Sequence, residues 1–270
     1  MTRVTLSASP ATEVGLSFGS VLRRGVLAGV SAGLAAAVVI WFVVEPVIRR
    51  ALAIEDVRSM HGGQSAPAGL PAHGGDEPLV SRAVQVVGGA VTAVLVGVAV
   101  GVIFAVVFAR MRERLPGRGD FGRSMVLATI GFAAVSLLPA LKIPSNPPAV
   151  GNPETVGQRT MLYAVVLLLG VVVALLVPVL DQRLAARGTV PSTRWAVDVV
   201  ATVVLVVLVL VLVPGSPDAV PPDVPAGLIW DFRLASLAQL ATMWLTLGLV
   251  FGLLLERVAA PQRALTSVSA

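Results

Sequence analysis

Long apolar stretches alternate with short polar segments along the chain, and six such stretches occur in its 270 residues. Each could cross a bilayer as a helix, because crossing needs roughly 20 apolar residues at a rise of about 1.5 Å each. The pattern therefore predicts an all-α, polytopic membrane protein, folded as a bundle of six transmembrane helices. The expected spans are Val26–Val44, Ala83–Ala109, Met125–Leu141, Met161–Leu180, Val199–Val213 and Leu234–Leu255.

The composition agrees with this interpretation. Hydrophobic residues make up 56% of the chain and charged residues 13%, whereas soluble domains carry about 25% charge. The third span contains Pro139, and the fifth is short and rich in valine. A valine run would also suit a buried strand, but an open strand edge leaves backbone groups unpaired in lipid. We therefore predict helix in all six spans.

Positive charge is divided unevenly between the two sides of the predicted bundle. Thirteen of the 20 lysine and arginine residues lie before the first helix, in the second and fourth connections, or after the last helix. Positively charged connections resist translocation, so this side is predicted to be cytoplasmic, with both termini inside. The predicted organisation is a cytoplasmic segment 1–21, a membrane domain 22–257 and a cytoplasmic tail 258–270. The net charge of +5 then reflects topology and not nucleic-acid binding.

The three connections on the opposite, outer side are rich in proline, which favours stiff, extended turns. The first, 47–81, contains a Gly/Pro/Ala/His run and is expected to be a mobile loop without regular structure. Each outer connection ends in an arginine that begins the returning helix: Arg82, Arg159 and Arg233. Two interpretations are compatible with this spacing, three repeated helical hairpins or arginines that anchor helix ends at the membrane surface.

Small residues recur at helical spacing inside the spans. Such spacing lets helix backbones approach closely, which matters because lipid removes the hydrophobic drive for helix association. We expect these positions to form helix contacts, either within one chain or between chains. They are Gly25, Gly29 and Gly33 in the first span, Gly97 and Gly101 in the second, and Gly248 and Gly252 in the sixth.

Signatures of catalysis are missing from the sequence, which argues against an enzyme. It contains no GxxxxGK[ST] phosphate loop, no HExxH motif and no pair of carboxylates deep in a predicted helix. Asp198 approaches the interior of the fifth span, and its spacing from Arg194 predicts a helix-end ion pair. The chain has no cysteine, so disulfides and thiolate metal sites are excluded. We predict no bound cofactor.

Ionisable side chains gather instead on the outer side. Imidazole and carboxylate groups suit divalent first-row metals, and an acidic rim would concentrate cations. The alternative is that the two histidines are solvated loop residues. Outer arginines would oppose cation attraction unless paired, and proximity in sequence suggests Glu154–Arg159 and Asp231–Arg233 as pairs. The candidate metal ligands are His61, His73, Glu45, Glu55 and Asp56.

The third outer connection goes beyond generic membrane character. LKIPSNPPAVGNPETVGQRTMLY, Leu141–Tyr163, resembles the most recognisable segment of the CbtA family, the probable cobalt transporter subunit. The EP dipeptide after the first span, VSRAVQ at 80–85 and IWDFRLASLAQL at 229–240 agree with it. The resemblance singles out Lys142, Pro144, Asn146, Pro147, Pro148, Glu154 and Arg159 in the outer loop, and Arg82, Gln85, Asp231 and Arg233 where helices re-enter.

The resemblance implies a multi-pass protein of the cytoplasmic membrane that takes part in cobalt uptake, with a small CbtB-like subunit as partner. Relatives often carry more histidines between the first two helices than the two found here. We expect a divalent cation, cobalt first, to be drawn to the outer carboxylates and to pass under the rim at 146–154. A non-transporting membrane scaffold and an enzyme acting on a lipid-linked substrate are the alternatives.

Overall fold

The computed structural model describes residues 17–63, 81–148 and 150–268, and within them every regular element is a helix. Six helical spans in this part of the chain are long and apolar enough to cross a membrane, which confirms the predicted fold class. The spans are Phe18–Arg58, Arg82–Met111, Gly119–Lys142, Val156–Ala186, Pro191–Leu212 and Ala226–Arg257.

Several spans consist of more than one helical element. The elements in chain order are α1 (Phe18–Val39), η1 (Ile40–Val44), α2 (Glu45–Gly63), α3 (Arg82–Met111), α4 (Gly119–Gly131), η2 (Phe132–Leu137), α5 (Leu138–Lys142), η3 (Pro153–Thr155), α6 (Val156–Ala186), α7 (Pro191–Leu212) and α8 (Ala226–Val268).

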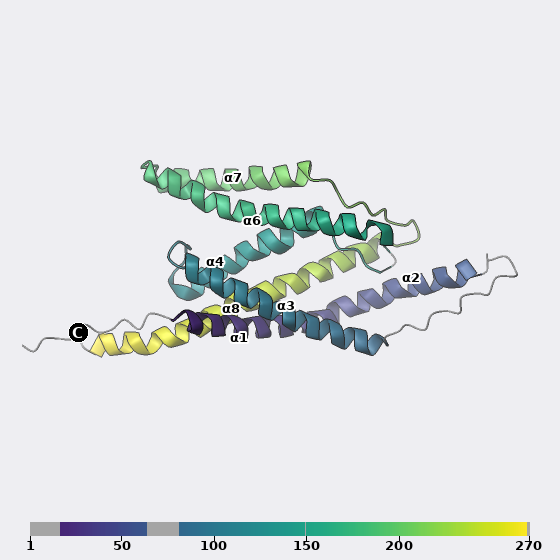
Figure 1. Cartoon of the computed structure of the whole chain (residues 1–270), viewed down its shortest axis with the longest axis horizontal. Helices are drawn as coiled ribbons and strands as arrows, with labels where there is room; N and C mark the ends of the chain where they lie inside the picture. The colour runs from purple at the N-terminus through teal and green to yellow at the C-terminus, as the bar shows by residue number, and fades with distance from the viewer. Residues whose placement is uncertain (1–16, 64–80, 149, 269–270) are drawn as a thin grey trace, which may run out of the picture.

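Successive spans run in opposite directions along the bundle (Figure 1). The start of α1 and the end of α8 therefore lie at the same end, together with the connections α3–α4 and α6–α7. The segments 143–155 and 213–225 lie at the opposite end, which we call the outer end. This arrangement separates the arginine-rich connections from the proline-rich ones, while the assignment of the arginine-rich end to the cytoplasm stays a prediction from charge.

Two short π-helical segments, η1 and η2, each end shortly before a proline. The N–H of Glu45 bonds the carbonyl of Ile40, and the N–H of Leu138 bonds that of Ala133, so each ring is one residue wider than in an α-helix. Pro46 and Pro139 follow directly. Proline has no N–H to donate to the preceding turn, and its ring would clash with the carbonyl oxygen of that turn in a regular α-helix. The wider turns accommodate the prolines, so both spans stay helical past them.

The expectation of a mobile, irregular loop over 47–81 is wrong for its first part. The helix continues as α2 to Gly63, while 64–80 lies outside the described residues. Val47, Ala51 and Ile54 follow helical spacing and pack against Leu228 and Ile229 at the start of α8. This apolar face stabilises α2 as helix, although the glycines and histidine near its end are typical of a loop.

Two groups of helices have separate apolar cores. Side chains from α1, α3, α4 and α8 form the larger core, where Phe251 makes edge contacts with Phe104 and Phe108 at centroid distances of 5.2 and 5.1 Å. A smaller core joins α5, α6 and α7 through Leu138, Val166 and Val209. Because α7 packs on α6 whereas α8 packs on α1 and α4, the described helices do not form three equivalent hairpins.

The predicted small-residue contacts form within one chain. Gly25 and Gly29 of α1 face Gly101 and Gly97 of α3 so closely that a methyl group at any of them would overlap backbone atoms of the other helix. Gly248 and Gly252 of α8 lie against α4, where a methyl group would overlap the Ala128 side chain and the Phe121 backbone, respectively. These contacts hold α1, α3, α4 and α8 together without a hydrophobic drive.

Candidate functional site

A cavity of about 470 Å³ opens near the outer end, between η2–α5, α6 and α8. It lies on the boundary between the two helix groups, since α6 belongs to one and α8 to the other. Its outer wall is the segment singled out by the family resemblance. The lining residues are Ser136, Ala140, Ile143, Pro144, Ser145, Asn146, Val150, Arg159, Thr160, Tyr163, Ser236, Leu237 and Leu240.

The polar groups of the lining are hydroxyls, one side-chain amide and one guanidinium. Ser136 lies within η2, the π-helical segment of the third span, and its Oγ accepts a hydrogen bond from the indole N–H of Trp244 at 2.9 Å. Arg159 is the charged residue of the lining. No carboxylate, imidazole or thiol occurs among these lining residues, so the cavity does not offer the ligands typical of a tight transition-metal site.

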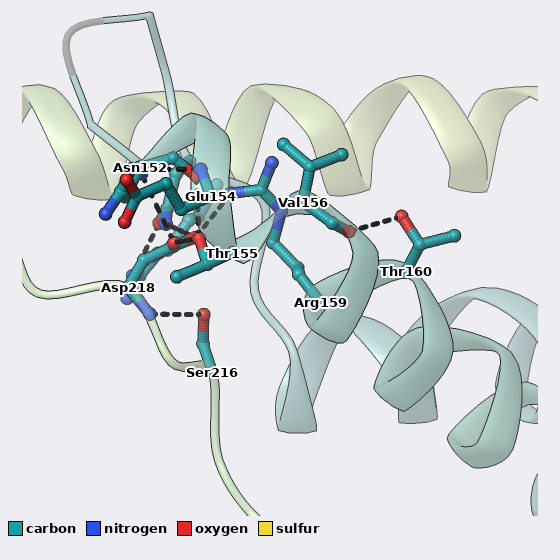
Figure 2. Close-up of polar contacts among 10 residues, drawn as sticks. Asn152, Glu154, Thr155, Val156, Arg159, Thr160, Ser216 and Asp218 are labelled. Carbon is teal, nitrogen blue, oxygen red and sulfur yellow. Dashed lines mark hydrogen bonds and ion pairs between the residues drawn. The ribbon is translucent and has the colours of Figure 1, made fainter.

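Asp218 holds the outer wall in place (Figure 2). Its side chain is 0% exposed, and it accepts hydrogen bonds from Thr155 Oγ1 at 2.5 Å and from the guanidinium of Arg159. Residues 142–159, which the family resemblance singles out, are called the motif loop. Asn146 of this loop donates through Nδ2 to Asp218 at 3.4 Å. The hydrogen bond from Thr155, with help from Arg159, holds the pKa of Asp218 below its usual range. The buried carboxylate therefore links two outer connections to the start of α6.

Arg233 of α8 reaches the same loop. Its Nη2 donates to Asn146 Oδ1 at 3.2 Å, while its Nε is buried and has no hydrogen-bond partner among the described residues. Lys142, at the end of α5, donates to the carbonyl oxygen of Leu210 in α7 at 2.7 Å. The motif loop is thus held to neighbouring elements by Lys142 and Arg159 at its two ends and by Arg233 from α8.

The prolines of the motif loop shape the cavity wall differently. Pro144 lines the cavity, whereas Pro147 is fully buried and Pro148 is partly buried. Glu154 is exposed, and its backbone N–H donates to Asn152 Oδ1 at 3.0 Å. Arg159 pairs with Asp218 and not with Glu154, so that predicted pair is wrong.

Glu45 is buried where α1–η1 passes into α2. Its side chain is 5% exposed and accepts from Arg49 Nε at 3.0 Å and from the guanidinium of Arg82, whose Nε lies 3.1 Å away. Arg82 also donates to Gln85 on its own helix at 2.9 Å. Glu45 therefore connects the first span to the start of α3, with both its oxygens engaged by arginine.

Two further ion pairs attach α2 to the sixth span and to the connection before it. Arg50 Nη2 lies 3.1 Å from Asp231 Oδ2, so the predicted pair Asp231–Arg233 is wrong. Arg58 donates to both oxygens of Asp223 at 2.6 and 2.8 Å, and this hydrogen bonding lowers the pKa of Asp223. Four of the outer acidic residues are therefore paired with arginines, namely Glu45, Asp218, Asp223 and Asp231.

The candidate metal ligands do not converge in the described part of the chain. Glu55 and Asp56 are exposed on α2, whereas Glu45 is buried between arginines. The backbone of His61 continues α2, but its side chain and all of His73 lie outside what the structure describes. Over the described residues, no group of three His, Cys, Asp or Glu side chains could hold a metal ion. A site built with the histidines stays a prediction.

Charged residues at the opposite end of the bundle also pair across connections. Arg194 of α7 donates to both oxygens of Asp181 on α6 at 2.7 Å, so the predicted pair with Asp198 is wrong. Arg112 binds Asp120 with two hydrogen bonds of 2.6 Å. These pairs close the α6–α7 and α3–α4 connections.

Sequence reasoning missed the hydroxyl groups of the cavity. Ser136, Thr160 and Ser236 are isolated polar residues in long apolar spans, close in sequence to Pro139, Arg159 and Arg233. A hydroxyl one turn from a proline or arginine near a helix end would have been a usable signal. Tyr163, the single tyrosine of the chain, completes the polar lining.

Comparison with known proteins identifies the family of the chain. No curated protein and no solved structure matches the chain. A family model described as "Probable cobalt transporter subunit (CbtA)" matches residues 18–256, from the start of the first span to one residue before the end of the sixth, including the proline-rich segments 143–155 and 213–225. The chain therefore belongs to the CbtA family of probable cobalt transporter subunits.

Proposed function

We propose that this chain is the membrane subunit that carries cobalt across the cytoplasmic membrane, with the outer cavity as its first binding place. The observation that carries the proposal is the coincidence of two features. The family match extends over the whole six-helix body, and the cavity's outer wall is built from the family's motif loop.

The position of the cavity supports passage of a solute. It begins at the outer end and reaches the third span at Ser136, between two helix groups that have separate cores. Substrate sites of many membrane transporters lie between two such bodies, near interrupted helices. Movement of α6 and α7 against α1, α3 and α8 would change access to this cavity.

The proposal includes the orientation predicted from charge. The motif loop would face outward, and the arginine-rich connections and both ends of the chain would be cytoplasmic. A small CbtB-like membrane subunit is the proposed partner. Delivery of cobalt into the cell is the proposed direction, and the transmembrane potential would favour entry of positive charge by about 2.3 kcal/mol per charge at 100 mV.

Uptake of radioactive cobalt by cells provides the test. Cells that express the chain, with and without its partner, should accumulate cobalt above an empty-vector control. Ser236→Trp should abolish the increase by filling the cavity. Leu245→Trp, which places the same side chain at an exposed position of the same helix, should not.

Purified protein in liposomes separates transport from a scaffold role. A transporter should release or accumulate cobalt in the vesicles, either alone or with its partner. Equal cobalt contents in protein-containing and empty liposomes, under an imposed potential and with the partner present, would contradict the proposal. That result would favour the scaffold.

A further inference from the structure

The size of the outer cavity is unusual for a bare metal ion. A divalent ion with six waters occupies roughly 180 Å³, taking about 30 Å³ for each water. The cavity has about 470 Å³, which lies in the range of about 300–1,000 Å³ typical of small-molecule sites. The space therefore fits a metal together with an organic ligand better than a hydrated ion alone.

The charge of the lining points in the same direction. Arg159 faces the cavity with its side chain 32% exposed, whereas the side chain of its counter-ion Asp218 is 0% exposed. The Asp218 carboxylate thus holds the Arg159 guanidinium in position by an ion pair, but it is not part of the cavity lining. A cationic group with several remaining N–H donors is suited to carboxylate or phosphate oxygens, and it repels a metal cation.

A second guanidinium, that of Arg233, lies next to the cavity wall. Arg233 is about one helical turn before Ser236 and Leu237, and it donates to the Asn146 amide oxygen. Among the described residues its hydrogen bond goes to this neutral amide, so its positive charge is not cancelled by an ion pair. The outer opening of the cavity therefore combines two guanidinium groups, Arg159 and Arg233, with hydroxyl groups, and this combination favours binding of a small anion.

We propose that cobalt enters this cavity as a complex with a small carboxylate-bearing ligand, whose oxygens bind Arg159 and the neighbouring hydroxyl and amide groups. The metal needs no protein carboxylate or imidazole in the cavity, because the organic ligand supplies its donors. This inference rests on the proposed transport function and specifies the form in which the substrate is recognised.

Equilibrium dialysis of the purified protein in a neutral detergent tests the proposal, with radioactive cobalt and citrate as the probes. Citrate competes for metal if the protein binds the aquo ion, so adding it should lower the bound cobalt. If the complex is the ligand, citrate should raise the bound cobalt, by about tenfold or more over cobalt chloride in a non-coordinating buffer.

Paired substitutions remove the cavity guanidinium without leaving a buried charge. The double variant Arg159→Gln, Asp218→Asn keeps the net charge and should weaken binding of cobalt citrate by about tenfold, the scale of one charge-assisted contact. The matched control is Arg58→Gln, Asp223→Asn, an outer arginine–aspartate pair away from the cavity lining, and it should bind as the wild type does. Thermal unfolding and size-exclusion profiles of both variants check that they are folded.

Each outcome bears on a different statement. Citrate that only lowers the bound cobalt would overturn the inference and leave cobalt transport itself intact. Citrate without metal that binds as tightly as the complex would also overturn it, since the cavity would then be a site for an organic anion. Tight binding of cobalt citrate with no cobalt uptake in liposomes would instead sustain the inference about binding while contradicting the transport function.

Discussion

The contact between α1 and α3 allows a quantitative prediction, because glycine backbones touch there without intervening side chains. A β-carbon placed on Gly97 would lie 2.5 Å from the carbonyl oxygen of Gly29 and 2.8 Å from the Cα of Gly33. Ordinary contacts of this kind are about 3.4–4 Å, so Gly97→Ala should force the two helices roughly 1 Å apart. We predict a loss of stability from this separation.

The magnitude follows from two opposing contributions. Overpacking in a close-packed interior costs about 1–3 kcal/mol. Replacing glycine by alanine within a helix favours the folded helix by about 0.8–1.0 kcal/mol. Gly97→Ala should therefore lower the free energy of unfolding by about 0–2 kcal/mol, and by about 1–3 kcal/mol more than a glycine-to-alanine change that meets no neighbour. Gly89→Ala supplies the control, because Gly89 lies on the same helix and a β-carbon there would meet nothing within 4 Å.

Comparison of the two variants isolates the packing contribution, since the helix propensity change is the same in both. Unfolding by denaturing detergent in mixed micelles, followed by the fluorescence of the 4 tryptophans, measures the free energy of unfolding. Gly89→Ala should be neutral or stabilising. If the two variants unfold within about 0.5 kcal/mol of each other, the close α1–α3 contact does not exist in the membrane protein.

Three further predictions concern orientation, the cavity floor and the outer wall. The chain has no cysteine, so single cysteines can be introduced to test its orientation. A membrane-impermeant maleimide should label Gly215→Cys in intact cells but Pro116→Cys only after permeabilisation. The reverse labelling pattern would contradict the proposed topology. Ser136→Ala leaves the buried indole N–H of Trp244 without its acceptor and should lower the free energy of unfolding by about 1–3 kcal/mol, measured as above. The same change should cost less in a Trp244→Phe background, and an equal cost in both backgrounds would contradict the hydrogen bond. The pKa of Asp218 is lowered in the folded protein, so its stabilising effect is fully present at neutral pH and is lost as the pH falls through the ordinary aspartate range towards that lower pKa. The melting temperature of Asp218→Asn should therefore depend less on pH over this interval than that of the wild type. Equal pH dependence of the two melting temperatures would refute this role.

The spans could be predicted from sequence because their cause is local. A helix that crosses lipid must satisfy its own backbone and present apolar side chains, and both requirements are visible in a continuous stretch of residues. The same reasoning identified Gly97 and Gly101 as contact positions. It could not choose their partner, since Gly29 and Gly25 are far away in sequence and meet them only after the spans have packed.

The ion pairs were predicted less well, for a physical reason. Neighbouring charges such as Glu154 and Arg159 are the pairs that a sequence suggests, but an exposed pair of this kind gains little in water. In the structure Arg159 reaches Asp218, which is fully buried in another connection. A buried carboxylate requires a counter-ion, and only the folded arrangement of the connections decides which arginine supplies it.

The two kinds of contact divide the molecule in a way that bears on transport. Backbone-to-backbone glycine contacts and the larger apolar core join α1, α3, α4 and α8, and such contacts do not respond to salt or pH. Helices α6 and α7 pack on the outer half of the continuous span α4–η2–α5, and at the outer end Arg233 of α8 is joined to the loop before α6 by a hydrogen bond to Asn146. Hydrogen bonds of this kind exchange readily with water or with a ligand, because their net free energy is only about 0.5–1.5 kcal/mol each. A substrate with several anionic oxygens could therefore replace the hydrogen bond at the cavity mouth and free the outer loop from α8, while the glycine-packed body stays intact.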